Sequence, residues 1–247
     1  MTSPIPGLLV LLVTLAGCGG GAEPVPPRTG TDPILVIRRY PGLAPAASRY
    51  ALPAFTLLAG GTAVLAAADQ GIVVTGDRRT LTADEVTRLY DQAAGADLFA
   101  SHRYGDDVPD ASVLVVRIMS ATARYETSVI APSISDGGDR GRVVDFAAAA
   151  TRAGTAAGTY LPERVAVVIV ADGDGASDVR PWPLTTPATG MPGYPSRPCL
   201  ITGAGEVRAA VRTATTGTRW TTDDGHQVAL RVRPLLAYER SCADLEV

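Results

Sequence analysis

Three aspartates on one glycine-rich segment have the residue type and spacing of a metal site. Asp172, Asp174 and Asp178 lie in the run Asp-Gly-Asp-Gly-Ala-Ser-Asp, at positions i, i+2 and i+6. Calcium prefers such hard oxygen ligands, but an EF-hand loop needs another acidic residue near its twelfth position, where this chain has Pro183. A turn after a strand explains the same residues. We therefore assign no metal ligand and keep a calcium-stabilised structural domain as an alternative.

A second acidic cluster suggests hydrolysis. Asp106, Asp107 and Asp110 stand together before an apolar run, and paired carboxylates can cleave glycosidic bonds. Such enzymes generally line their cleft with aromatic residues, which make up only 5% of this chain. We interpret the cluster as solvated loop charge, with a carboxylate-dependent hydrolase acting on envelope material as the alternative.

Other catalytic chemistry has few residues available. All 22 basic residues are arginine, so a Schiff-base or P-loop lysine is excluded. The only histidines, His102 and His226, belong to no His-Glu-x-x-His motif, and the chain has no Gly-x-Ser-x-Gly elbow. We expect both to be surface loop histidines. The sequence thus gives no catalytic residue and no cofactor, and we lean towards a non-enzyme.

The N-terminus carries an apolar run that ends at a cysteine. Residues 8–16 are too few to span a bilayer but suit the hydrophobic part of a secretory signal. The run ends in Leu15-Ala16-Gly17-Cys18, which resembles a bacterial lipobox. That resemblance implies a signal peptide over residues 1–17 and a diacylglyceryl group, with chains such as palmitate, on Cys18. Residues 1–7 depart from the pattern because they contain no basic residue.

A lipid on Cys18 would make the next residues a membrane tether. Residues 18–33 contain four glycines and four prolines and little that could pack. Fully extended, they would reach about 50 Å. We therefore expect a lipid-anchored protein on the extracytoplasmic face of the cell membrane. In such a compartment the remaining pair, Cys199 and Cys242, is expected to form a disulfide.

Hydrophobic periodicity gives the expected elements of the folded part. Thr82-Ala83-Asp84-Glu85 is a capping box that opens a helix, and Gly60-Gly61 and Asp224-Gly225 mark two hairpin turns. The further elements are strands over 34–39, 55–59, 62–67, 112–119, 124–131, 164–170, 218–222 and 226–233, and helices over 141–153 and 206–213.

These elements predict an α+β fold with two small antiparallel sheets, each covered by helices. We place an N-terminal α+β unit at 34–153, a linker at 154–162 and a C-terminal α+β unit with the disulfide at 163–247. The second unit contains Pro181–Pro198, a proline-rich loop that we interpret as a cover for the core or as a recognition surface.

Two stretches carry further resemblances. The order of elements from Phe55 to Ala153, with an acidic Tyr104-Gly105-Asp106 loop, is similar to uncharacterised bacterial envelope domains. The C-terminal pattern Arg233-Pro234-Leu235-Leu236, followed by Cys242, resembles the ends of uncharacterised actinobacterial envelope lipoproteins. These resemblances imply an envelope location and no particular activity.

The functional prediction rests on these exclusions. A net charge of −3 and a pI near 5.4 argue against nucleic acid as a partner. We predict a non-enzymatic envelope module, held at the membrane through Cys18, that binds an envelope protein, a peptide or a small ligand.

Overall fold

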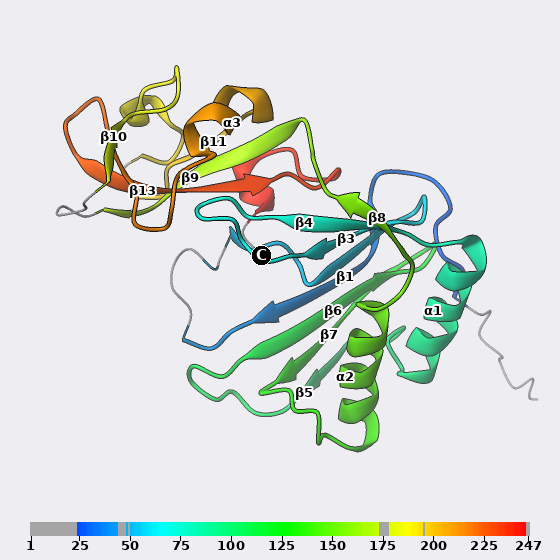
Figure 1. The fold of residues 1–247 in the computed structure, drawn as a ribbon. Helices are drawn as coiled ribbons and strands as arrows, with labels where there is room; N and C mark the ends of the chain where they lie inside the picture. Colours follow the sequence, from blue (N-terminus) through cyan, green and yellow to red (C-terminus); the bar gives the residue numbers. More distant parts are fainter. Residues whose placement is uncertain (1–23, 44–47, 49, 173–177, 195, 246–247) are drawn as a thin grey trace, which may run out of the picture.

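The computed structural model describes residues 24–43, 48, 50–172, 178–194 and 196–245, with the side chains of 171 and 172 left out. Two sheets dominate this part of the chain (Figure 1). The large sheet has eight strands in the order β5-β7-β6-β1-β2-β3-β4-β8, and the small sheet has five in the order β10-β12-β13-β9-β11.

The element bounds are as follows. The large sheet consists of β1 (Pro33–Tyr40), β2 (Phe55–Leu58), β3 (Thr62–Ala66), β4 (Gly76–Thr80), β5 (His102–Tyr104), β6 (Val113–Met119), β7 (Arg124–Ile130) and β8 (Thr155–Thr159). The small sheet consists of β9 (Arg164–Asp172), β10 (Val179–Pro181), β11 (Cys199–Gly203), β12 (Arg219–Thr221) and β13 (Gln227–Pro234). The helices are α1 (Ala83–Gly95), α2 (Gly138–Ala150), α3 (Ala204–Val211) and the short 3-10 turns η2 (Ala188–Gly190) and η3 (Cys242–Asp244).

Helices α1 and α2 cover one face of the large sheet (Figure 1). The predicted capping box opens α1: the backbone N–H of Glu85 donates to Thr82 Oγ1, and the backbone N–H of Thr82 donates to Glu85 Oε2 at 2.8 Å. The apolar faces of both helices pack on alternate strand residues such as Ile37 and Phe55, both fully buried. The opposite face of the large sheet is not covered by these two helices.

The small sheet and the segments around it lie against part of that opposite face. Val64 of β3 packs with Leu52, Val74 and Leu236 in one buried cluster. A parallel bridge also joins Val73 to Val232 of β13. The two sheets therefore share an apolar junction, and the half of the large sheet formed by β1, β6 and β7 stays partly open.

The structure corrects the predicted α+β class: the fold is mainly β, and it is not a pair of antiparallel sheets each covered by helices. Both sheets are mixed, because β5 runs parallel to β7 and β10 runs parallel to β12. Two of the three α-helices in the described ranges lie on the large sheet, and the small sheet has only the eight-residue α3. Residues 155–159, inside the predicted linker, form β8 and pair with β4.

Five strands were missed, and four of them are short and carry no apolar alternation; the fifth, β11, reads Cys-Leu-Ile-Thr-Gly. Strands β4, β5, β8 and β10 read Gly-Asp-Arg-Arg-Thr, His-Arg-Tyr, Thr-Ala-Ala-Gly-Thr and Val-Arg-Pro. Backbone hydrogen bonds to neighbouring strands hold these segments in place, and three of the four, β5, β8 and β10, lie at sheet edges. Hydrophobic periodicity does not detect such strands.

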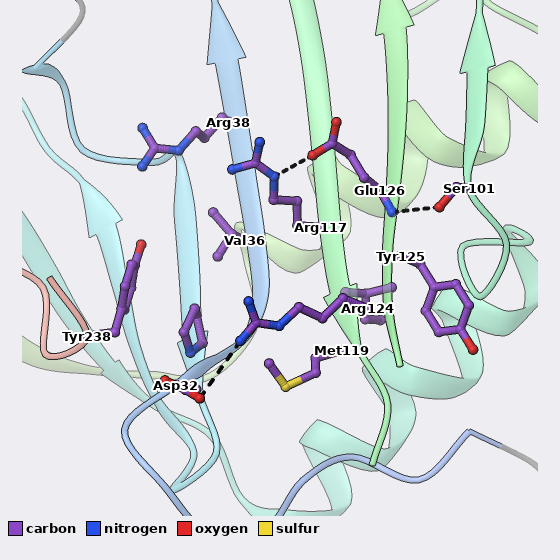
Figure 2. Close-up of a pocket in the computed structure, with 12 residues that line it drawn as sticks. Asp32, Val36, Arg38, Ser101, Arg117, Met119, Arg124, Tyr125, Glu126 and Tyr238 are labelled. Atoms are coloured by element: carbon purple, nitrogen blue, oxygen red, sulfur yellow. Dashed lines mark hydrogen bonds and ion pairs between the residues drawn. The ribbon is translucent and has the colours of Figure 1, made fainter. Parts of the chain in front are cut away.

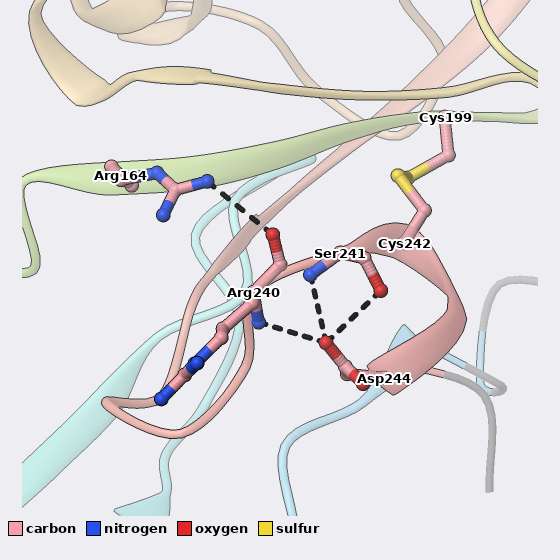
Figure 3. The surroundings of a disulfide bond; sticks show 6 residues. All are labelled: Arg164, Cys199, Arg240, Ser241, Cys242 and Asp244. Carbon is pink, nitrogen blue, oxygen red and sulfur yellow. Dashed lines mark hydrogen bonds between the residues drawn. A yellow bond between two sulfur atoms is a disulfide. The ribbon is translucent and has the colours of Figure 1, made fainter. Parts of the chain in front are cut away.

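The predicted disulfide is present. Cys199 at the start of β11 and Cys242 in η3 are joined, with their Cα atoms 6.1 Å apart (Figure 3). A capping box made by Ser241 and Asp244 holds the η3 turn. Leu245 beyond it is fully buried. The bond therefore fastens the C-terminal segment to the edge of the small sheet.

Part of the segment predicted as a tether packs on the fold. Residues 24–28 lie beside α1, and the carbonyl of Val25 accepts a hydrogen bond of 3.0 Å from the backbone N–H of Ala121. Cys18 and the predicted signal peptide lie outside the described residues. No helix within the described ranges is long and apolar enough to cross a membrane.

Candidate ligand-binding cleft

A cleft of about 510 Å³ opens on the uncovered face of the large sheet. We call it the arginine cleft, after Arg38 of β1, Arg117 of β6 and Arg124 of β7, which line it (Figure 2). Asp32, just before β1, borders it at one end, and Tyr238, from the segment after β13, borders it at the side. Strands and the C-terminal segment together thus form its walls.

Strand register brings these side chains to one face. Val36 of β1 lies opposite Arg117, and Arg117 lies opposite Glu126 of β7. Directly paired residues share a face, and successive residues on a strand alternate between faces. Arg38 is therefore on the same face as Val36, whereas Ile37 between them points into the core under the helices.

Two of the three arginines already have an acidic neighbour. Arg117 Nε lies 2.5 Å from Glu126 Oε2, and Arg124 Nη2 lies 3.9 Å from Asp32 Oδ2. Charge-assisted N–H···O bonds are normally about 2.7–2.9 Å long, so the second pair is a loose contact. Both pairs are also well exposed, which limits their contribution to stability.

Arg38 differs from both. Its side chain lines the cleft, yet the residue is only 6% exposed. Its Nε has no acceptor, and no described residue forms a hydrogen bond or an ion pair with its guanidinium. A guanidinium stays charged at any pH at which the protein folds, so Arg38 is a buried positive charge without a partner among the described residues.

Tyr238 adds a hydroxyl donor beside this charge. Burial and the nearby Glu239 carboxylate raise the pKa of Tyr238, and the positive charges of Arg38 and Arg233 oppose that rise. The phenol therefore keeps its proton at neutral pH and can donate a hydrogen bond. Val36 and Met119 supply apolar surface in the same cleft. The arrangement can bind a group that accepts hydrogen bonds and carries negative charge.

The aspartates predicted as hydrolase candidates lie elsewhere. Asp106, Asp107 and Asp110 are all exposed in the loop between β5 and β6. Asp107 pairs with Arg103, and Asp110 has a positive φ of 57°. None of the three lines the arginine cleft. The structure does not bring them into a shared cavity there.

The two histidines also stay apart from the cleft. His102 is in β5, where its Nε2 lies 2.9 Å from Asp97 Oδ2 and its ring lies beside Tyr104. His226 is exposed at the turn between β12 and β13. Neither residue lines the arginine cleft.

The calcium alternative lies partly outside the described residues. Asp174 lies outside the described residues, and the structure does not describe the side chain of Asp172. Asp178 already binds Arg180 through both carboxylate oxygens, at 2.9 and 2.8 Å, and accepts a hydrogen bond of 2.6 Å from Thr218. Within the described ranges, no group of three His, Cys, Asp or Glu side chains could hold a metal ion.

The described part of the proline-rich loop, residues 181–194 and 196–198, lies against the small sheet. Met191 and Leu184 are buried in the core of that sheet, and Trp182 packs at its edge. Trp182 Nε1 donates a hydrogen bond of 2.8 Å to the carbonyl of Thr186, and the loop is tied to the β12–β13 turn through Asp223 and Asp224. These contacts fit the interpretation of the loop as a cover for the core.

Sequence reasoning missed the arginine cleft. The available signal was Arg38 itself, the first charged residue after the apolar run Ile34–Ile37 and on the same face as Val36. A charged residue that directly follows an apolar run within one strand is unusual and marks a position to examine. No family model, curated protein sequence or solved structure matches the chain, so the cleft is interpreted from its own geometry.

Proposed function

We propose that this protein is a lipid-anchored binding module of the extracytoplasmic face of the cell membrane, and that the arginine cleft is its ligand site. The observation that carries the proposal is the convergence of three arginines and a tyrosine hydroxyl on one cleft. Its volume falls in the ~300–1,000 Å³ range typical of small-molecule sites. Because of this volume, we propose a small molecule rather than a protein as the ligand.

The expected location is supported by the sequence and is consistent with the disulfide. The lipobox-like Leu15–Cys18 run is the motif for anchoring, and a disulfide between Cys199 and Cys242 suits an oxidising compartment. We extend this to the proposal that the chain is an envelope lipoprotein like those its C-terminal pattern resembles.

A binding role fits the cleft better than hydrolysis. The cleft has two carboxylates, Asp32 and Glu126, and each faces an arginine. A glycosidase of the common type needs one carboxyl that is free to act as a proton donor. In this cleft Glu126 is hydrogen-bonded to Arg117 and Asp32 faces Arg124, so the structure shows neither carboxyl group free for that role.

The anchoring half of the proposal is tested by fractionation of the producing cells. Cys18→Ala should move the full-length protein from the membrane fraction to the soluble exported fraction, because the lipid attachment atom is gone. Gly20→Ala, two residues away, is the matched control and should stay with the membrane. Wild-type protein that is already soluble and carries no acyl mass would refute the anchor.

The binding half is tested by native mass spectrometry of protein purified from its own cells. A retained non-covalent ligand should be lost in Met119→Trp, because the larger side chain fills the cleft. Val108→Trp, at an exposed loop position, is the control and should retain the ligand. A ligand that persists in Met119→Trp would place the site elsewhere.

A further inference from the structure

We infer that the arginine cleft recognises an organic oxyanion, a carboxylate or phosphate group on an apolar body, and that Arg38 is the residue that selects it. The inference rests on the proposed function, because it names the ligand class of the same cleft. It is carried by the unpaired charge of Arg38, by the charge balance of the cleft and by the apolar surface next to it.

Arg38 carries a buried charge that lacks a partner among the described residues. Removing a charge from water is strongly unfavourable unless a partner of opposite charge or several hydrogen bonds compensate it. At 6% exposure, Arg38 has lost most of its water and has gained no acceptor among the described residues. Arginine cannot relieve this by losing its proton. A bound anion would supply the missing partner.

The charged side chains that line the arginine cleft do not balance. Three guanidinium groups face the cleft against two carboxylates, Asp32 and Glu126, which leaves one positive charge uncompensated. Glu126 is held by Arg117 at 2.5 Å, whereas Asp32 is 3.9 Å from Arg124. The loose pair can open, so that Arg124 can join Arg38 in holding a group with more than one anionic oxygen.

The donor groups of the arginine cleft are arranged to suit an oxyanion. A guanidinium offers a planar fork of N–H donors that matches the oxygens of carboxylate and phosphate. The guanidinium groups of Arg117 and Arg124 extend across β1 on either side of Val36, with Arg38 and Tyr238 bordering the same space (Figure 2). The Tyr238 hydroxyl is a further donor. Val36 and Met119 provide apolar surface that an apolar part of the ligand can contact.

The experiment measures thermal unfolding of the full-length wild type with three small probes. Phenyl phosphate and phenylacetate carry the two oxyanions, and 2-phenylethanol is the neutral control. Each anion should raise the unfolding midpoint by about 2–4 °C at a few times its Kd, and the alcohol should not. Equal shifts with all three probes, or none with either anion, would overturn the inference.

Arg38→Gln is the decisive variant, because it keeps polar bulk and removes the charge. Its affinity for the anions should fall by about tenfold or more. Arg39→Gln, the neighbouring exposed position, makes the same charge change and should bind like wild type. Undiminished anion binding by Arg38→Gln would refute the role of Arg38. If the native ligand is lost in Met119→Trp but retained in Arg38→Gln, the cleft remains the ligand site and only the inference about Arg38 fails.

Two further measurements separate the remaining possibilities. Vesicles of phosphatidylglycerol, compared with phosphatidylcholine, test whether a lipid headgroup is the source of the oxyanion; binding to phosphatidylglycerol that requires Arg38 would identify it. In anion-free buffer, Arg38→Met should unfold at the same or a higher temperature than wild type, because it removes an uncompensated charge. A marked loss of stability would show that Arg38 has a structural role instead.

Discussion

The buried ion pair at the end of the small sheet allows the sharpest prediction of stability. The side chains of Arg233 of β13 and Glu239 are both fully buried. Their side chains form a two-pronged contact, with Nη1 to Oε2 at 2.6 Å and Nη2 to Oε1 at 2.7 Å. Glu239 Oε2 also accepts a hydrogen bond of 2.7 Å from the backbone N–H of Leu236. The pair thus fixes the turn that leads to Tyr238.

Glu239→Gln keeps the shape of the side chain and removes its charge. Arg233 then remains charged, fully buried and without a counterion, and such losses cost about 3–5 kcal/mol. Since domains of this size are typically stable by about 5–15 kcal/mol, the change should remove a large part of the total. Urea unfolding followed by circular dichroism, with the slope compared between variants, measures this loss.

The double variant Arg233→Met with Glu239→Leu gives the critical comparison. It removes both charges together, including an Arg233 Nε that has no acceptor, so most of the stability should return. Arg142→Gln, which breaks an exposed pair with Asp139, is the surface control and should cost less than about 1 kcal/mol. The reasoning fails if Glu239→Gln costs under about 1 kcal/mol, or if the double variant is as unstable as the single one.

Two other predictions concern the small sheet. Cys199 and Cys242 are 43 residues apart in sequence, and replacing both by Ala removes the cross-link between them. In the chain-entropy model this should lower the free energy of unfolding by about 4 kcal/mol. The same urea titration measures the loss, and reduced wild-type protein should show a similar one. Hydrogen bonds from Arg180 and Thr218 lower the pKa of Asp178 below its ordinary value of 3.8, so its stabilising effect is present above that pH and is lost as the pH falls through the lowered value. Asp178→Asn should therefore weaken the acid dependence of the unfolding midpoint below pH 4; an unchanged profile would contradict this.

The elements that the sequence predicts well are those with a strong periodic signal or a local hydrogen-bond motif. The capped helix, the Gly60-Gly61 hairpin and the β6–β7 pair all form where periodicity and turn chemistry place them. Gly61 has a φ of 76°, and a Cβ there would lie 2.5 Å from the carbonyl oxygen of Leu81, so the turn requires glycine.

The overall class was wrong because edge strands depend on their neighbours. β8 exists as a strand because β4 offers an unpaired edge, and nothing within Thr155–Thr159 itself indicates this. The same holds for β5, whose parallel pairing with β7 joins segments that are 25 residues apart. Long-range pairing of this kind is not encoded in local periodicity.

The candidate site was missed for a related reason. The acidic clusters attracted attention because several carboxylates are adjacent in sequence, whereas the arginines of the cleft come from three separate strands. Arg38, Arg117 and Arg124 meet only through the β1–β6–β7 register. Arg38 alone carried a local signal, as a charge that directly follows an apolar run.

Under the proposed anchoring at Cys18, the packing of residues 24–28 beside α1 would set how far the folded part can lie from the bilayer. Only the six residues 18–23 would connect the lipid on Cys18 to the packed segment, and six residues of fully extended chain span about 20 Å at most. Asp32, four residues past the packed segment, borders the arginine cleft. With the proposed anchor, this short connection would keep the cleft within a thin layer above the bilayer. Ligand binding would then depend on the ligand concentration at the membrane surface rather than in the surrounding medium.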